Sequence, residues 1–175
     1  FTMRPNPYKN ETTVADYIAA MRRAGSRAVW LVPPGQCLWT WLYEDILGVC
    51  AKRRIPAFLH RDLVTPDHIV KVCESFPLLR LVLVGVGYGD DWWLYPLMRR
   101  FRHVSVCLGH FYIPSSGPMR FLEHFPADRL LFGSGLPSFS PGGIIAHVMY
   151  AEMSGKDRNK VLSGNILRLL EDARI

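Results

Sequence analysis

Two polar residues that can do chemistry, His60 and Asp62, stand directly after an apolar run. That run, Ile55-Pro-Ala-Phe-Leu59, is typical of a buried strand, so both residues are expected in the loop at a strand end. A neutral imidazole serves as a metal ligand or as a general base, and His60 is the leading candidate for either role. The alternative for His60 is a hydrogen-bonded histidine that only supports the fold.

Two further polar residues occupy the same kind of position. His110 follows the apolar run 103–107 and has the same alternatives as His60. Ser134 stands between two glycines, as a nucleophile on a sharp turn does, but the G-x-S-x-G pattern is incomplete. We therefore take His110 and Ser134 as candidate substrate contacts. The other histidines are expected in packed or solvated positions, with His103 at the opposite end of its strand and the rest within helices: His68, His124 and His147.

A glycine-rich stretch, Gly85-Val-Gly-Tyr-Gly-Asp90, follows another apolar run. Between a strand and a helix, such a stretch brings bare backbone close to a pyrophosphate in nucleotide-binding sheets. The match is incomplete, because Asp90 stands where the pattern needs its last glycine and no acidic residue follows about twenty positions later. A tight barrel loop that needs a positive φ is the favoured interpretation, and a nucleotide-binding sheet is the alternative.

The segments around these candidates alternate between strand-like and helix-like patterns. Short apolar runs predict five strands, at residues 28–32, 55–59, 80–84, 103–107 and 129–132. Apolar residues at helical spacing predict helices that begin near residues 14, 39, 66, 92, 118, 143, 156 and 165. Thr13 and Asp16 form a capping pair for the first helix, Gly25 stops it, and Thr65 caps the third.

Apolar strands that alternate with helices imply a parallel sheet covered by helices, either an open doubly wound sheet or a barrel. In both architectures the active site lies in the loops after the carboxyl ends of the strands. A closed eight-stranded barrel takes about 250 residues, so this chain is too short for one. The expected fold is α/β, of the (β/α)8 TIM-barrel type, with only about five βα units present and the front strands absent.

The composition is that of a globular protein. The chain has 175 residues, of which 49% are hydrophobic and 12% aromatic, and we expect one domain over residues 1–175. No run reaches the roughly eighteen apolar residues of a membrane helix, and the first residues show no signal pattern, so a soluble chain is expected. The four cysteines stand far apart without a CxxC pair, which favours free thiols in the cytoplasm.

The basic residues do not favour a nucleic-acid partner, although the net charge is +6. They gather in three short clusters, 22–23, 52–54 and 99–100, and each cluster ends a predicted helix. Cations at that position complement the helix dipole and the unpaired carbonyls of the last turn. No basic stripe is interleaved with stacking aromatics. We therefore expect no nucleic-acid binding.

Several tryptophans and tyrosines fall near predicted loop ends, where stacking on a flat ligand is one role for them. Packing between helices and sheet is the commoner role. The helical spacing of Trp39, Tyr43 and Ile46 favours that packing.

The last part of the chain resembles the ending of amidohydrolase-related proteins. The resemblance is carried by Arg129-Leu-Leu-Phe-Gly-Ser-Gly-Leu-Pro137, then a helix, then Asn165-Ile-Leu-Arg-Leu-Leu170. In that family the last barrel strand carries Gly-Ser/Thr-Asp-x-Pro, and an Asn-x-x-x-Leu motif closes the fold. Residues 55–60 and 76–84 resemble the family's segments around strands five and six. The resemblance extends over about residues 14–170.

What the resemblance implies is a (β/α)8 barrel with a divalent metal, usually zinc, that activates water. The usual ligands are a His-x-His on strand one, a histidine after strand five, a histidine on strand six and an aspartate on strand eight. Only His60 matches this set, because Gly85 and Gly135 stand at the strand-six and strand-eight positions and strand one is absent. A catalytic zinc needs three protein ligands. Either an altered site is supplied from outside this sequence, or this branch has abandoned the metal.

The resemblance implies a hydrolase, or a nonoxidative decarboxylase, that acts on a small organic molecule. His60 is then a remnant metal ligand or a base. The alternative is a barrel without catalytic activity that binds a ligand or a partner protein. Five βα units leave an unpaired sheet edge and exposed apolar helix faces, so we also expect self-association or a partner chain that completes the barrel.

Overall fold

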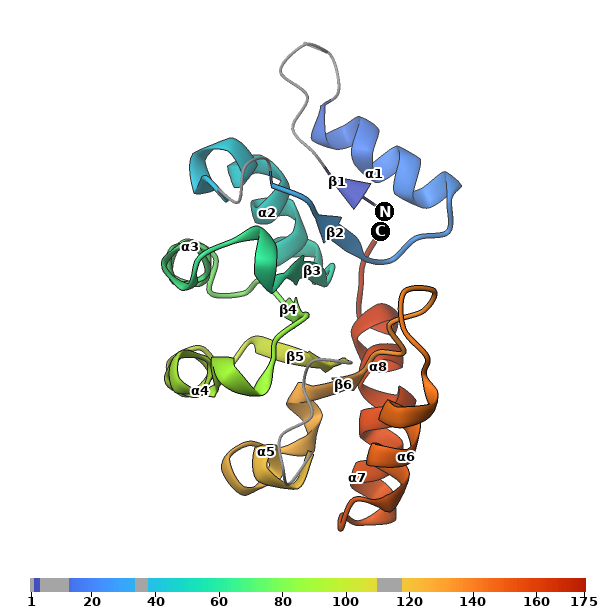
Figure 1. The fold of residues 1–175 in the computed structure, drawn as a ribbon. Helices are drawn as coiled ribbons and strands as arrows, with labels where there is room; N and C mark the ends of the chain where they lie inside the picture. Colours follow the sequence, from blue (N-terminus) through green and yellow to red (C-terminus); the bar gives the residue numbers. More distant parts are fainter. Residues whose placement is uncertain (1, 4–12, 34–37, 110–117) are drawn as a thin grey trace. The chain divides into compact units, whose positions relative to one another are not determined.

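Strands and helices alternate along the chain in the computed structural model, which describes residues 2–3, 13–33, 38–109 and 118–175. The chain forms two compact units (Figure 1). The first consists of Phe1–Val82 with Leu169–Ile175, and the second of Leu83–Arg168. Strand β4 (Leu81–Val84) crosses from one unit into the other.

The first unit holds three parallel strands, each followed by a helix (Figure 1). Its elements are β1 (Thr2–Met3), α1 (Val14–Arg23), β2 (Val29–Leu31), α2 (Thr40–Arg53), β3 (Ala57–His60), a 3-10 helix (Arg61–Leu63) and α3 (Pro66–Ser75). β2 lies between β1 and β3, with Trp30 opposite Thr2 on one side and Phe58 on the other.

Helix α1 begins and ends where the sequence predicts. The backbone N–H of Asp16 donates to the Thr13 hydroxyl (3.2 Å), and the backbone N–H of Thr13 donates to the Asp16 carboxylate (2.8 Å). The Thr13 hydroxyl also donates to the Asp16 carboxylate (2.7 Å), and this bond, followed by the one from the Thr13 backbone N–H, holds the pKa of Asp16 below its usual range. Gly25 follows with φ +63°, a left-handed conformation that ends the helix.

Alternate residues of β2 and β3 separate a buried face from a half-buried one. The buried set is Val29, Leu31, Ala57 and Leu59. On the other face the rings of Trp30 and Phe58 are stacked, with centroids 6.1 Å apart and planes 3° from parallel. Because side chains two residues apart share one face of a strand, His60 lies on the face of this aromatic pair.

The last residues of the chain pack within the first unit. The Arg80 guanidinium and the Asp172 carboxylate are 2.8 Å apart. The backbone N–H of Arg174 donates to the carbonyl of Arg53 at the end of α2 (2.9 Å). These bonds hold the C-terminal segment beside the helices that the unit builds from its first eighty residues.

The second unit continues the alternation. Its elements are the end of β4, a 3-10 helix (Tyr88–Asp90), α4 (Asp91–Arg100), β5 (Val104–Leu108), α5 (Pro118–His124), a 3-10 helix (Ala127–Arg129), β6 (Leu130–Phe132), α6 (Gly142–Tyr150), α7 (Gly155–Asn159), a π-helix (Lys160–Gly164) and α8 (Asn165–Glu171). β5 and β6 are parallel, with Cys107 opposite Leu131. The π-helix joins α7 to α8, so the last two predicted helices form one helical run.

Most of the predicted elements are confirmed, and three details are wrong. The prediction missed β1, because Thr2–Met3 is too short for an apolar run to be visible. Trp39 is 44% exposed at the start of α2, whereas Tyr43 and Ile46 are buried as predicted. Thr65 precedes α3, but its side chain makes no capping hydrogen bond there; its hydroxyl lies 3.0 Å from Nδ1 of His68 instead.

The described cysteines Cys50, Cys73 and Cys107 are free and buried. Burial raises their pKa values to about 12, 12 and 11. They therefore stay protonated at neutral pH and behave as small apolar side chains. Cys37 lies outside the described residues. Among the described helices, none has the length and apolar character needed to cross a membrane.

Candidate functional site

His60 and Asp62 come together in one turn at the carboxyl end of β3. The backbone N–H of Asp62 donates to Nδ1 of His60 (3.3 Å), so the imidazole accepts a bond from the 3-10 helix that follows its own strand. The Asp62 carboxylate lies 3.7 Å from the same nitrogen and 3.0 Å from the guanidinium of Arg61. The structure thus pairs the two residues that the sequence singled out first.

This turn leaves the imidazole accessible and oriented. The side chain of His60 is 29% exposed and that of Asp62 is 62% exposed. The bond to Nδ1 restricts rotation of the ring, and among the described residues no hydrogen bond engages Nε2. A half-buried imidazole at a strand end, on the face of the Trp30–Phe58 stack, can accept or donate a proton and sits beside an aromatic surface.

Ser134 lies in the second unit, in the loop after β6. Its hydroxyl oxygen accepts a bond from the backbone N–H of Leu136 (3.4 Å), which holds the serine in a tight turn. No helix follows directly, since α6 begins at Gly142. This is the arrangement of a hydroxyl-capped turn and not of a nucleophile on a strand-to-helix elbow. The role of Ser134 as a substrate contact stays a prediction.

Gly133, the residue before Ser134, is packed against the neighbouring strand. Its backbone N–H donates to the carbonyl of Leu108 (2.8 Å), and a Cβ added to it would lie 2.6 Å from Sγ of Cys107. We expect Gly133→Ala to lower the free energy of unfolding by about 1–3 kcal/mol, the usual cost of overpacking a close contact. Urea unfolding of the natural-length protein, followed by circular dichroism, measures this change.

Two companion variants make this test specific. In the background Cys107→Ala the sulfur is gone, so we expect Gly133→Ala to lose most of its additional cost. Gly143→Ala in α6 is the matched control, because a Cβ there meets nothing within 4 Å and alanine is the better helix former. An equal cost of Gly133→Ala with and without the Cys107 sulfur would contradict the proposed contact.

Asp90 is a residue whose role the sequence reasoning missed. It is 6% exposed, and its carboxylate accepts bonds from the backbone N–H of Gly87 (2.8 Å) and from the indole N–H of Trp93 (3.0 Å). The carboxylate therefore accepts the backbone N–H of Gly87, a donor that a phosphate bound in the glycine-rich loop would need. The tight-loop interpretation is supported by Gly85 at φ +76°. A Gly-x-x-Asp capping pattern was the available signal.

The remaining histidines differ in their surroundings. His103 precedes β5, at the amino end of that strand, and burial followed by the charge of Arg129 lowers its pKa. His124 is exposed in α5, with its ring 5.1 Å from that of Tyr95. His68 and His147 lie within α3 and α6. His110 lies outside the described residues, so its predicted role as a substrate contact stays a prediction.

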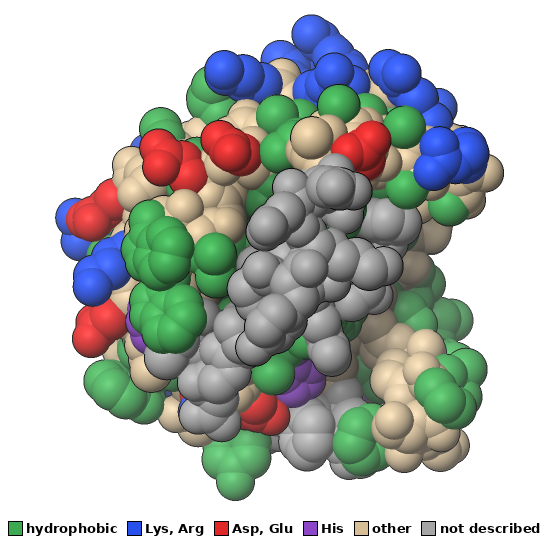
Figure 2. All heavy atoms as spheres, turned by 90° about the horizontal axis from the view of Figure 1, so that it is seen from above, with side chains coloured by type: hydrophobic (Ala, Val, Ile, Leu, Met, Phe, Trp, Pro, Cys, Tyr) green, Lys and Arg blue, Asp and Glu red, His purple; other side chains and the backbone are tan. Residues whose placement is uncertain are grey.

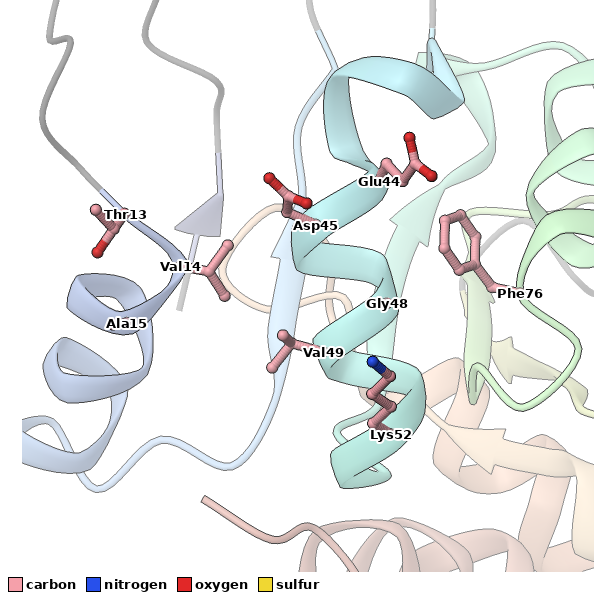
Figure 3. A pocket seen from close by; sticks show the side chains of 9 residues that line it. All are labelled: Thr13, Val14, Ala15, Glu44, Asp45, Gly48, Val49, Lys52 and Phe76. Atoms are coloured by element: carbon pink, nitrogen blue, oxygen red, sulfur yellow. The ribbon is translucent and has the colours of Figure 1, made fainter.

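One hollow of the first unit lies between helices and away from the strand end. It has a volume of about 610 Å³ and is lined by the start of α1, by one side of α2 and by Phe76. Figure 3 shows the lining side chains Glu44 and Asp45 in the first half of α2 and Lys52 in its last turn. In the second unit, a hollow of about 400 Å³ lies between the start of α4 and α5. No predicted site residue lines either hollow.

The predicted basic clusters lie at the ends of helices. Figure 2 shows most Lys and Arg side chains of the displayed face along its upper edge, with others beside acidic side chains at the left. The predicted basic clusters lie in the last turns of α1, α2 and α4, with Arg54 directly after α2. This placement is the one that compensates helix dipoles.

The described residues do not fit the divalent metal that the family resemblance implies. Within the described ranges, no group of three or more His, Cys, Asp or Glu side chains is arranged to hold a metal ion. The positions of two usual ligands are occupied by Gly85 and Gly135, and both have left-handed φ, +76° and +70°. A side chain at either position would be strained.

Comparisons with known proteins agree with the architecture. A family model described as amidohydrolase matches residues 4–171. No curated protein matches the chain. Among solved structures, an uncharacterised TIM-barrel protein from Bordetella bronchiseptica is similar to 93% of this chain with a TM-score of 0.72 and 20% identity. The chain covers 64% of that protein.

Two further structures have the same fold. The chain is similar to 2,6-dihydroxybenzoate decarboxylase from Rhizobium over 90% of its own length and 66% of that enzyme, with a TM-score of 0.73 and 15% identity. It is also similar to a putative 2-pyrone-4,6-dicarboxylic acid hydrolase from Pseudomonas putida, over 94% of its own length and 70% of that protein, with a TM-score of 0.66 and 20% identity. The predicted α/β fold of the (β/α)8 type, present in part, is confirmed. The chain spans less than two thirds of the Bordetella protein and of the decarboxylase.

Proposed function

This chain belongs to the amidohydrolase family, and from this premise we propose that it acts as a hydrolase or decarboxylase on a small organic acid. Both named enzymes among the similar structures act on compounds of this kind, a dihydroxybenzoate and a pyrone dicarboxylic acid. Their low identity to this chain supports the fold alone, so the substrate class is our proposal.

The observation that carries the proposal is the turn at the carboxyl end of β3. Active sites of this architecture lie at that end of the strands. There His60 is half-buried, held by the backbone of Asp62 and placed on the face of the stacked Trp30 and Phe58 rings. An imidazole beside an aromatic wall suits a flat substrate that must exchange a proton. In this proposal His60 and Asp62 act on the substrate, and His110 and Ser134 contact it.

Two further expectations remain part of the proposal. A partner chain or a second copy would complete the barrel, because the chain spans under two thirds of the first two similar structures described. A cytoplasmic location is proposed from the widely spaced, reduced cysteines, of which the described three are free.

The test is turnover by the natural-length protein on two substrates. These are 2,6-dihydroxybenzoate, assayed by release of CO2, and 2-pyrone-4,6-dicarboxylic acid, assayed by ring opening. We expect His60→Asn to lower kcat/KM by about 100-fold or more, the usual contribution of general acid–base catalysis. His68→Asn is the matched control, since His68 is also a half-buried histidine of the first unit but lies on helix α3.

Either of two results would contradict the proposal. Turnover that survives in His60→Asn to the extent seen in His68→Asn would remove His60 from the chemistry. Absence of turnover on both substrates, with the protein folded, would favour the barrel that binds a ligand or partner without catalysis.

A further inference from the structure

The tautomer of a neutral His60 ring follows from the turn after β3. Nδ1 of His60 accepts the backbone N–H of Asp62, so this nitrogen carries a lone pair and the proton of the neutral ring is on Nε2. Nε2, which makes no hydrogen bond to a described residue, is then a hydrogen-bond donor. This step, and the inference built on it, rests on the function proposed above.

A metal would need the opposite arrangement. An imidazole that binds a metal through Nε2 carries its proton on Nδ1 and donates it to a carboxylate or a carbonyl. Here the atom that faces Nδ1 at 3.3 Å is a backbone nitrogen that itself donates, and the Asp62 carboxylate is further away at 3.7 Å. Metal binding through Nε2 would place two N–H groups against each other.

The second unit contributes an independent observation. Gly135 has φ +70°, and a Cβ on it would lie 3.2 Å from Cδ2 and 3.3 Å from Cβ of Phe139. The backbone N–H of Phe139 donates to the carbonyl of Gly135 (3.0 Å), which closes this turn. An aspartate at this position would have to open the turn or displace Phe139. Gly85, at φ +76°, is the second position without a ligand side chain.

We infer that this protein works without a divalent metal at the family's ligand positions, and that His60 uses Nε2–H to donate a hydrogen bond to a carboxylate or carbonyl oxygen of its substrate. The ligand class follows from the donor: an anionic or strongly polarised oxygen gains most from a fixed N–H at a half-buried site. The nearby guanidinium of Arg61 pairs with Asp62 and so offsets the negative charge beside that oxygen.

The experiment has two readouts that do not depend on turnover. The natural-length protein is equilibrated with Zn²⁺, passed through a desalting column and analysed for zinc per chain, beside His60→Gln and His68→Gln. Separately, nitrogen-15 NMR of histidine-labelled protein, with His60→Gln used to assign the signal, reports which imidazole nitrogen carries the proton. We expect the same substoichiometric zinc in all three proteins, and the Nε2–H form for His60.

Binding of 2,6-dihydroxybenzoate separates the donor role from a structural one. The amide N–H of glutamine can replace Nε2–H, so His60→Gln should bind this probe within a few-fold of the natural protein. His60→Ala should bind it roughly 10- to 100-fold more weakly, the effect of one hydrogen bond to a charged group. Stoichiometric zinc that disappears in His60→Gln would overturn the inference, and so would an Nδ1–H ring. Absence of turnover alone would contradict the proposed function, but it would not change the zinc content or the nitrogen-15 signals on which this inference is tested.

Discussion

We expect Asn165→Asp to lower the free energy of unfolding by about 3–5 kcal/mol at pH 7, the cost of an uncompensated buried charge. Asn165 is 2% exposed, and its amide donates to the carbonyls of Ala127 (2.7 Å) and Leu130 (2.8 Å). Both bonds come from the one amide nitrogen, so a carboxylate would turn an acceptor oxygen toward two carbonyl acceptors. Chemical unfolding of the natural-length protein measures the loss.

The loss of stability in Asn165→Asp should also change with pH in a defined direction. Burial would raise the pKa of the new carboxyl above its value in the unfolded chain. Such a group binds more protons when folded, so the penalty is largest at neutral pH and shrinks as the pH falls through the raised pKa. Asn159→Asp is the matched control, an exposed asparagine of the same helical run. A cost no larger than that of the control, or one that grows in acid, would contradict the role assigned to Asn165.

The position of Asn165 shows what the sequence pattern does and does not contain. Periodicity predicts a helix that begins at this residue, and the resemblance to the family's closing motif marks the asparagine as unusual. Neither shows that its amide reaches across to the start of β6. The π-helix Lys160–Gly164 directly precedes this residue, and such a wider turn is not visible in an apolar pattern of helical spacing.

Strand and helix order could be predicted because it depends on local chemistry. Apolar runs too short for a helix, turn residues after them and capping pairs such as Thr13 and Asp16 are all visible within a few residues. β1 could not be predicted, since two residues become a strand only by pairing with β2. The burial of Trp39 was predicted wrongly for a related reason. Helical spacing shows which residues share one face of a helix, but not how far along the helix other elements pack against that face.

The candidate site was predicted in part. The rule that chemistry lies after parallel strands led to His60, Asp62 and Ser134, and the first two do share one turn. The hydrogen bond that sets the ring of His60 involves a backbone N–H, which carries no residue label in a sequence. The role of Asp90 also depends on a backbone N–H that the sequence does not show. Its carboxylate accepts hydrogen bonds from the backbone of Gly87 and the indole of Trp93, in a loop whose glycines otherwise resemble a phosphate site.

Arg129 is a half-buried side chain whose replacement should cost much stability. Its guanidinium donates to three backbone carbonyls, those of Met98 (2.8 Å), Phe101 (2.9 Å) and Val104 (2.8 Å). These carbonyls belong to the end of α4 and the start of β5, so one side chain fixes the turn between them. Burial, helped by Arg102, lowers the pKa of Arg129 to about 10, which leaves it charged at pH 7.

We expect Arg129→Met to lower the free energy of unfolding by about 3 kcal/mol, because three half-buried carbonyls lose their donor while the aliphatic volume is kept. Arg129→Lys should recover only part of this loss, since an ammonium cannot reproduce the planar fork that reaches three acceptors. Arg168→Met is the control, because exposed Arg168 donates to the carbonyl of Asp128 at 3.1 Å. Equal midpoints of urea unfolding for Arg129→Met and Arg168→Met would show that the α4–β5 turn holds without this clamp.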